Sequence, residues 1–173
     1  MKIVRGRTYL MSELTVDGDI AMAGYSFTDM GNLVMAKNTG IEVLAALPTD
    51  GDFCGHTVIG TAGEDVVAGE VVYLKSDGEL WLADADLAAT MPVKAMATAD
   101  ILANADGVFL LDGFMRVDAW TWTIGNMLHA HTTPGAMVAT APAGTGDQVQ
   151  RLAIAVTADI VNFRPSKDVF EVT

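Results

Sequence analysis

The chain has 173 residues, of which 51% are hydrophobic and 18% charged, and its formal net charge is −12. This length fits one large domain or two small ones, with enough apolar residues for a packed core. The acidic charge argues against nucleic-acid binding, because it repels phosphates and no cluster of Lys and Arg offsets it. No apolar run approaches the roughly 18 residues of a membrane span, and no apolar segment of a signal peptide follows Lys2, Arg5 and Arg7. The single cysteine, Cys54, allows no intramolecular disulfide, so we expect a soluble protein made in a reducing compartment.

Residues 1–50 differ in character from the rest of the chain. They hold five of the ten methionines, and their glycines recur with only weak periodicity. We predict an extended arm or a few loosely organised strands here, ending near Gly51. An arm of this kind is often ordered only against a neighbouring subunit.

Glycine and proline divide residues 51–173 into short segments, which is typical of β structure. Turn signals are the Asp-Gly pairs that begin at Asp77, Asp106 and Asp112, and the pair Pro134-Gly135; another Asp-Gly pair begins at Asp17. Between these signals the sequence predicts strands at Val71–Leu74, Leu80–Ala83, Val93–Ala97, Val108–Leu111, Met127–His131, Met137–Thr140, Val149–Val156 and Ile160–Phe163.

Helix is expected to contribute little. Only two short Ala-rich stretches, Asp84–Thr90 and Ala99–Ala103, fit a single helical turn, and neither has a long amphipathic stripe. The prediction is therefore an all-β fold, with an N-terminal arm at 1–50 and a compact β-barrel or sandwich at 51–173.

The module also contains a weak internal repeat. The segment Gly69–Ile101 matches the segment Gly125–Ile160, with glycines 56 and 57 positions apart and the tetrapeptide Thr-Ala-Asp-Ile at the end of both. Each copy is predicted to form a hairpin, a loop, a third strand and a turn. A drifted duplication would give two three-stranded units packed together, and chance similarity between Ala/Thr-rich segments is the alternative.

A search for catalytic or metal-binding patterns gives little. His129 and His131 are two residues apart and would share a strand face, where they would be either two metal ligands or two histidines beside a turn. No cysteine or carboxylate stands at a supporting spacing. Cys54 and His56 lack an orienting third group, so a nucleophile–base pair is not predicted.

Other patterns are equally incomplete. Asp84 and Asp86 lack the glycine and the closing glutamate of a calcium loop, and Gly144-Thr-Gly146 lacks the third glycine of a dinucleotide site. We therefore expect no enzyme activity, no metal and no cofactor.

The tryptophans are the most informative aromatic residues. Trp120 and Trp122 would lie on one face of a strand, together with Arg116 and Asp118 by the same alternation. Paired tryptophans of this kind are either core anchors or anchors of a subunit or ligand interface. These four residues are the candidate partner-binding site.

Several short motifs, occurring in order over about residues 63–172, resemble a module of tailed-phage structural proteins. They are Val72-Tyr-Leu-Lys-Ser-Asp-Gly78, Ala83-Asp-Ala-Asp-Leu-Ala-Ala-Thr-Met-Pro92, Gly113-Phe-Met-Arg-Val-Asp118, Trp120-Thr-Trp-Thr-Ile-Gly125, Gly144-Thr-Gly-Asp-Gln-Val-Gln150 and Val161-Asn-Phe-Arg-Pro-Ser166. The family carries this module at the C-terminal end of capsid decoration, head-fibre and tail-fibre proteins. The resemblance implies a virion role and assigns no catalytic residue.

The expectation from the resemblance is a capsid decoration (cement) protein, made in the host cytoplasm and located on the capsid surface. It would bind the major capsid protein, bridge coat subunits and associate with itself as a homotrimer. The trimer follows from family habit and phage symmetry. The alternative is a head- or tail-fibre component in which Trp120 and Trp122 stack on a host-surface glycan. A metal-dependent enzyme using His129 and His131 is a third hypothesis.

Overall fold

The computed structural model describes residues 47–173, so the predicted arm at 1–50 lies outside the described part except for Leu47–Asp50. The described residues form an all-β module, which confirms the predicted fold class. One short 3-10 helix, η1 (Ala88–Thr90), lies inside the predicted turn Asp84–Thr90, and no helix in this part is long and apolar enough to cross a membrane. The strands are β1 (Phe53–Thr61), β2 (Val71–Leu74), β3 (Leu80–Leu82), β4 (Ala95–Ala97), β5 (Asp106–Arg116), β6 (Met127–Ala130), β7 (Met137–Val138), β8 (Gln148–Val149), β9 (Arg151–Ala155), β10 (Ile160–Phe163) and β11 (Phe170–Glu171).

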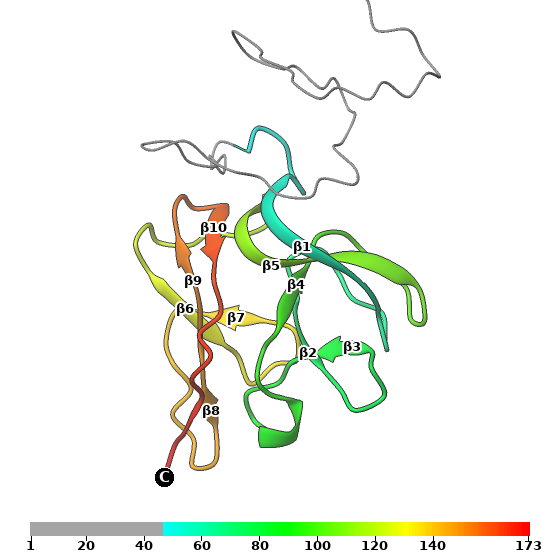
Figure 1. Cartoon of the computed structure of the whole chain (residues 1–173). Helices are drawn as coiled ribbons and strands as arrows, with labels where there is room; N and C mark the ends of the chain where they lie inside the picture. Colours follow the sequence, from blue (N-terminus) through cyan, green and yellow to red (C-terminus); the bar gives the residue numbers. More distant parts are fainter. Residues whose placement is uncertain (1–46) are drawn as a thin grey trace, which may run out of the picture. The chain divides into compact units, whose positions relative to one another are not determined.

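Nine of these strands form one antiparallel sheet that curls into a half-barrel (Figure 1). Its order is β3-β2-β4-β5-β10-β9-β6-β7, and β1 pairs with β5 outside this path. The long strand β5 lies at the centre of the sheet. β1 pairs along its whole length, and β4 and β10 also pair with it. A separate two-stranded sheet joins β8 to β11.

The sheet has two halves with the same strand pairing. In the first half (β3-β2-β4-β5), the hairpin β2–β3 is followed by β4, which pairs with the other edge of β2 and then with β5. In the second half (β7-β6-β9-β10), the hairpin β6–β7 is followed by β9, which pairs with β6 and then with β10. Each half therefore has the predicted hairpin and third strand, and a fourth strand that the repeat did not include.

Matched glycines begin the hairpins of the two halves. Gly69 (φ +86°) donates its N–H to the carbonyl of Ala97, the last residue of β4, over 2.9 Å. Gly125 (φ +85°) donates to the carbonyl of Ala155, the last residue of β9, over 2.9 Å. This left-handed backbone favours glycine, which explains why glycine stands at both positions. The pairing and these turns support the interpretation of the repeat as a duplication.

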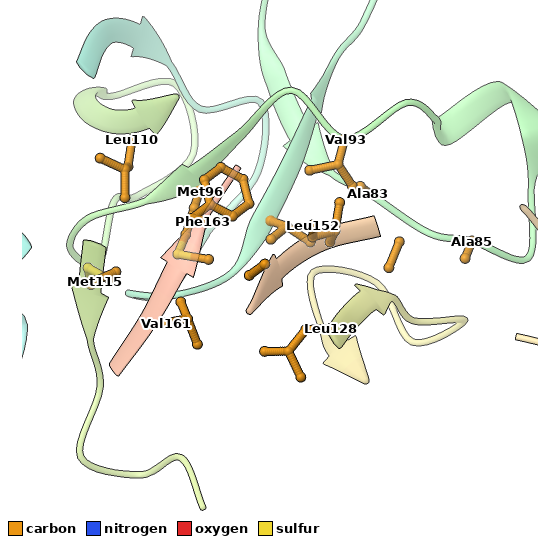
Figure 2. Packing of buried hydrophobic residues seen from close by; sticks show 13 residues of the cluster. Ala83, Ala85, Val93, Met96, Leu110, Met115, Leu128, Leu152, Val161 and Phe163 are labelled. Atoms are coloured by element: carbon orange, nitrogen blue, oxygen red, sulfur yellow. The ribbon is translucent and has the colours of Figure 1, made fainter. Parts of the chain in front are cut away.

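The main hydrophobic cluster lies inside the curl. Figure 2 shows Met96, Leu152 and Phe163 near its centre, contributed by strands of both halves. The two ends of the sheet also approach each other there, since Gly135 of the β6–β7 loop donates to the carbonyl of Ala83 over 2.8 Å. The cluster is therefore shared by the two halves.

A second cluster lies on the opposite face of the first half. Val72 and Phe109 belong to it, whereas their chain neighbours Val71 and Leu110 belong to the main cluster. Alternate residues of β2 and β5 thus enter different clusters, as the alternation of side chains along a strand requires. A parallel bridge between Ala62, just after β1, and Leu80 of β3 helps to enclose this second cluster.

Some predicted elements differ from the observed ones. The bounds of β2 and β10 match the prediction, but the predicted strand Val149–Val156 is divided into β8 and β9 at Gln150, whose side chain bonds to two other segments. The predicted helical turn at Ala99–Ala103 is wrong, because Ile101 forms an isolated antiparallel bridge with Val66. The bridge needs an extended backbone at Ile101.

Two of the predicted Asp-Gly turns are also wrong. Asp106-Gly107 and Asp112-Gly113 both lie within β5, while β1 was not predicted at all. Gly113 allows β5 to approach β1 closely, because an added Cβ would lie 2.2 Å from the carbonyl oxygen of Cys54. Gly55 faces it and would place a Cβ 2.1 Å from the carbonyl oxygen of Asp112. Only a pair of glycines lets β1 and β5 come this close.

Candidate functional site

The predicted tryptophan site lies in a loop at the end of β5. The strand ends at Arg116, and Val117 donates its N–H to the carbonyl of Asp159 over 2.9 Å. Trp120 then donates to the carbonyl of Val117 over 3.0 Å, which closes a turn. The prediction that Trp120 and Trp122 share a strand face is therefore wrong, because the backbone turns immediately after β5. We call residues 117–126 the tryptophan loop.

Both indoles are half-buried and pack against the main hydrophobic cluster. Their ring centroids are 6.2 Å apart and the planes are tilted by 52°, a common geometry for an aromatic pair. Trp120 covers Gly69, where an added Cβ would lie 2.7 Å from its Cζ2. Both predicted roles are thus compatible with the geometry, since each ring has a buried part and an exposed part.

The same loop exposes one further apolar side chain. Ile124 is 69% exposed, two residues after Trp122. Sequence reasoning missed it because one isoleucine in a Thr-rich segment has no pattern. Among the large apolar side chains of the loop, Ile124 is exposed whereas both tryptophans are half-buried.

Arg116 and Asp118 are held by contacts within the module. Arg116 Nε donates to Asp118 Oδ1 over 2.6 Å, its Nη2 lies 3.1 Å from Asp159 Oδ2, and its Nη1 donates to the carbonyl of Leu47 over 3.0 Å. The N–H of Asp118 donates to Asp50 Oδ1 over 2.8 Å. The two predicted partner-binding charges therefore connect residues 47–50 to the end of β5, next to the tryptophan loop.

The ion pairs also shift the ionisation of this cluster. The hydrogen bond to Asp118, followed by the charges of Asp118 and Asp159, raises the pKa of Arg116. The hydrogen bond from Thr157, together with a weaker contribution from Arg116, lowers the pKa of Asp159. Both shifts favour the charged forms of Arg116 and Asp159, so this ion pair is retained at neutral pH.

The histidines do not form a metal site within residues 47–173. No group of three or more His, Cys, Asp or Glu side chains is placed there to hold a metal ion. His131 Nδ1 accepts the N–H of Thr133 over 2.7 Å, so it supports the β6–β7 turn. Burial, followed by the charge of Arg151, lowers the pKa of His129, whose Nδ1 is buried without a hydrogen-bond partner in the described part of the chain.

The remaining candidates have local structural roles. Asp84 accepts the N–H of Asp86 over 2.9 Å in a tight turn, and Gly144 donates to Asp147 over 2.8 Å. Cys54 and His56 are on β1, where Cys54 lies beside the Gly55–Gly113 crossing. None of these contacts assembles a nucleophile with a base and an orienting group.

The tryptophan loop and residues 47–50, which are joined through Arg116 and Asp118, therefore form the candidate functional site. In comparisons with known proteins, no family model and no curated protein matches this chain.

Proposed function

We propose that this chain is a capsid decoration protein of a tailed phage, which binds the outer surface of the assembled shell and bridges coat subunits. The proposal combines the resemblance of the ordered motifs over residues 63–172 with the compact all-β module. The mechanism is adhesion. A ligand that binds the assembled shell and not its competing states stabilises that shell by mass action.

One observation carries the proposal: the apolar tryptophan loop lies next to the anchored start of the module. Ile124 is exposed beside the half-buried tryptophans, and Arg116 holds the carbonyl of Leu47 at the same end. A shell contact made through the loop would therefore lie beside residues 47–50, at the start of the described module. Two contacts on one protein, one from the loop and one from the preceding segment, suit a protein that connects neighbouring subunits.

The test begins with the number of copies in purified virions, measured by quantitative mass spectrometry against the major coat protein. A decoration protein is expected at a ratio near one to one with the coat protein, or at one per three-fold position. A handful of copies per particle would overturn the proposal and assign the chain to a fibre or vertex, with Trp120 and Trp122 as glycan-binding candidates.

A pair of variants then tests the surface. Ile124→Asp places a charge in the apolar loop, while Leu102→Asp changes an equally exposed side chain elsewhere (69% and 72% exposed). We expect Ile124→Asp to weaken co-sedimentation with empty shells about tenfold, as for a central apolar contact, and Leu102→Asp to leave it unchanged. Equal binding by both variants would exclude the tryptophan loop from the shell contact.

A further inference from the structure

Three surface hollows adjoin one another on the module. The first, of about 200 Å³, lies between β1 and the β2–β3 hairpin. The second, of about 440 Å³, lies between residues 92–94, just before β4, and the segment that follows β10. Lys94 and Leu111 line both of these, and Ser166 lines both the second hollow and a third one of about 430 Å³. The hollows therefore adjoin one another through shared lining residues, and we call them together the groove.

The first hollow is apolar and follows the edge of a strand. Val58, Ile59 and Gly60 of β1 all line it, although successive side chains of a strand point to opposite faces. A hollow that all three residues line must therefore run along the strand edge. Ile59 is 74% exposed, and Leu74 on the opposite wall is 58% exposed.

That edge of β1 is open for most of its length. β1 pairs with β5 along its other edge, and among residues 47–173 the open edge is met only beyond Thr61, where Ala62 bridges Leu80. The strand carries no Lys, Asp or Glu and no proline, which are the usual protections against pairing. Its backbone N–H and C=O groups are therefore available to an added strand.

Positively charged side chains line the second and third hollows. Residues 47–173 contain six Lys and Arg residues, and Lys75, Arg116 and Arg164 form ion pairs within the module. The other three form no ion pair within that range, and all three line the groove: Lys94, Lys167 and Arg151. Asp168 also lines the third hollow. On a chain with a net charge of −12, this is where an acidic group is best accommodated.

A buried glutamine fixes the walls of the second hollow. Gln150 is 1% exposed; its Oε1 accepts the N–H of Val93 over 2.7 Å, and its Nε2 donates to the carbonyl of Ser166 over 2.7 Å. The N–H of Ser166 donates to the carbonyl of Arg151 over 2.8 Å. The groove is thus formed before any ligand arrives, so less ordering is needed on binding.

We propose that this groove binds an extended segment of a partner protein that has apolar side chains at one end and acidic side chains at the other. The segment adds as a strand to the open edge of β1, with its apolar side chains against Ile59 and Leu74. Its carboxylates lie at Lys94 and Lys167. A polypeptide fits better than a nucleic acid, because the overall charge repels a polyanion and the first hollow is apolar. The inference goes beyond the proposed function and does not depend on it.

The test uses the full chain and two fluorescein-labelled peptides. One is Thr-Ile-Thr-Ile-Thr-Glu-Ser-Glu-Ser-Glu, and the matched control replaces each Glu with Lys. Fluorescence anisotropy is expected to show binding of the Glu peptide and none of the Lys peptide. Equal binding of the two peptides, or no binding of the Glu peptide, would overturn the proposal.

Variants locate the contact. Lys94→Ser with Lys167→Ser lowers the net charge as much as Thr132→Asp with Thr145→Asp, which changes two exposed residues outside the groove. The lysine variant is expected to bind the Glu peptide about fivefold more weakly, as for the loss of two exposed ion pairs, and the threonine variant to bind as the wild type does. Equal weakening in both would reduce the effect to net charge and contradict a specific site.

A third variant tests the strand edge. Ile59→Lys adds a protective charge at an exposed position and is expected to abolish peptide binding while leaving the thermal unfolding midpoint unchanged. Sedimentation velocity examines the remaining occupant. If the wild type self-associates, Ile59→Lys does not, and no peptide binds, the groove belongs to a second copy of the chain and the proposal is wrong.

Discussion

The two halves of the sheet have the same strand pairing but bury different parts of it. In the first half Val71 pairs with Met96, and at the matching positions of the second half Met127 pairs with Ile154. Met96 is fully buried in the main cluster, whereas Ile154 is 45% exposed. The next residues, Val72 in the first half and Leu128 in the second, point to the opposite face of the sheet, and both are fully buried.

This difference has a simple origin. Val72 enters the second cluster, whereas the matching Leu128 enters the main cluster. The other face of the first half also packs into the main cluster, where it meets the second half. The first half is therefore covered on both faces and the second half on one. A shared topology fixes which strands pair, while the added strand β1 and the contact between the halves decide which faces reach solvent.

The largest expected effect comes from the crossing that attaches β1 to the first half. Gly113→Ala would place a Cβ 2.2 Å from the carbonyl oxygen of Cys54, at a φ of +149°. We expect a loss of roughly 3–5 kcal/mol in the free energy of unfolding, measured by urea denaturation, from the clash and the backbone strain together.

Gly146→Ala is the matched control for that substitution. Gly146 also has a positive φ (+93°), but an added Cβ would meet nothing within 4 Å. Only the backbone strain applies, so we expect about 1–2 kcal/mol. Equal losses in the two variants would mean that the crossing is not as close as described.

The comparison between the halves is tested directly by Met96→Ala and Ile154→Ala. Truncation of the fully buried Met96 is expected to cost about 2–5 kcal/mol, because it removes contacts and leaves a cavity in the main cluster. Truncation of the half-exposed Ile154 is expected to cost about 1 kcal/mol or less. Similar losses on urea denaturation would show that the second half is also covered on both faces.

The sequence predicted the parts of this fold that depend on local pattern. Val71–Leu74 and Ile160–Phe163 are short apolar runs between turn signals, and both are strands with the predicted bounds. The repeat was visible because matched glycines are required at both hairpin starts. These features need only neighbouring residues.

The features that the sequence did not predict depend on distant residues. β1 contains Gly55, His56 and Gly60 and lacks alternation, and Gly55 is explained only by Gly113 across the crossing. The prediction that Trp120 and Trp122 share a strand face was wrong because the backbone turns where the N–H of Val117 bonds to the carbonyl of Asp159. The groove joins segments that are far apart in the chain, and no motif indicates such a surface.

The smallest expected effect concerns His129, on the hairpin of the second half. Burial and then the charge of Arg151 lower its pKa below the ordinary 6.5, while the backbone of Val138 has a smaller opposing effect. The folded state therefore binds the proton less well than the unfolded state, so its contribution to stability is complete above pH 6.5 and falls as the pH decreases below that value. The matching hairpin position in the first half is Tyr73, which is also half-buried. Thermal unfolding followed between pH 8 and 5 should show a lower midpoint at acid pH, and His129→Gln should flatten the curve in this range.

His56→Gln, at an exposed position of β1, is the control and should retain the wild-type slope. If His129→Gln keeps that slope as well, the His129 imidazole does not control the pH response between pH 8 and 5. Carboxylates such as Asp159, whose pKa is lowered from 3.8, lose their stabilising charge only below about pH 3.8 and therefore act outside this range.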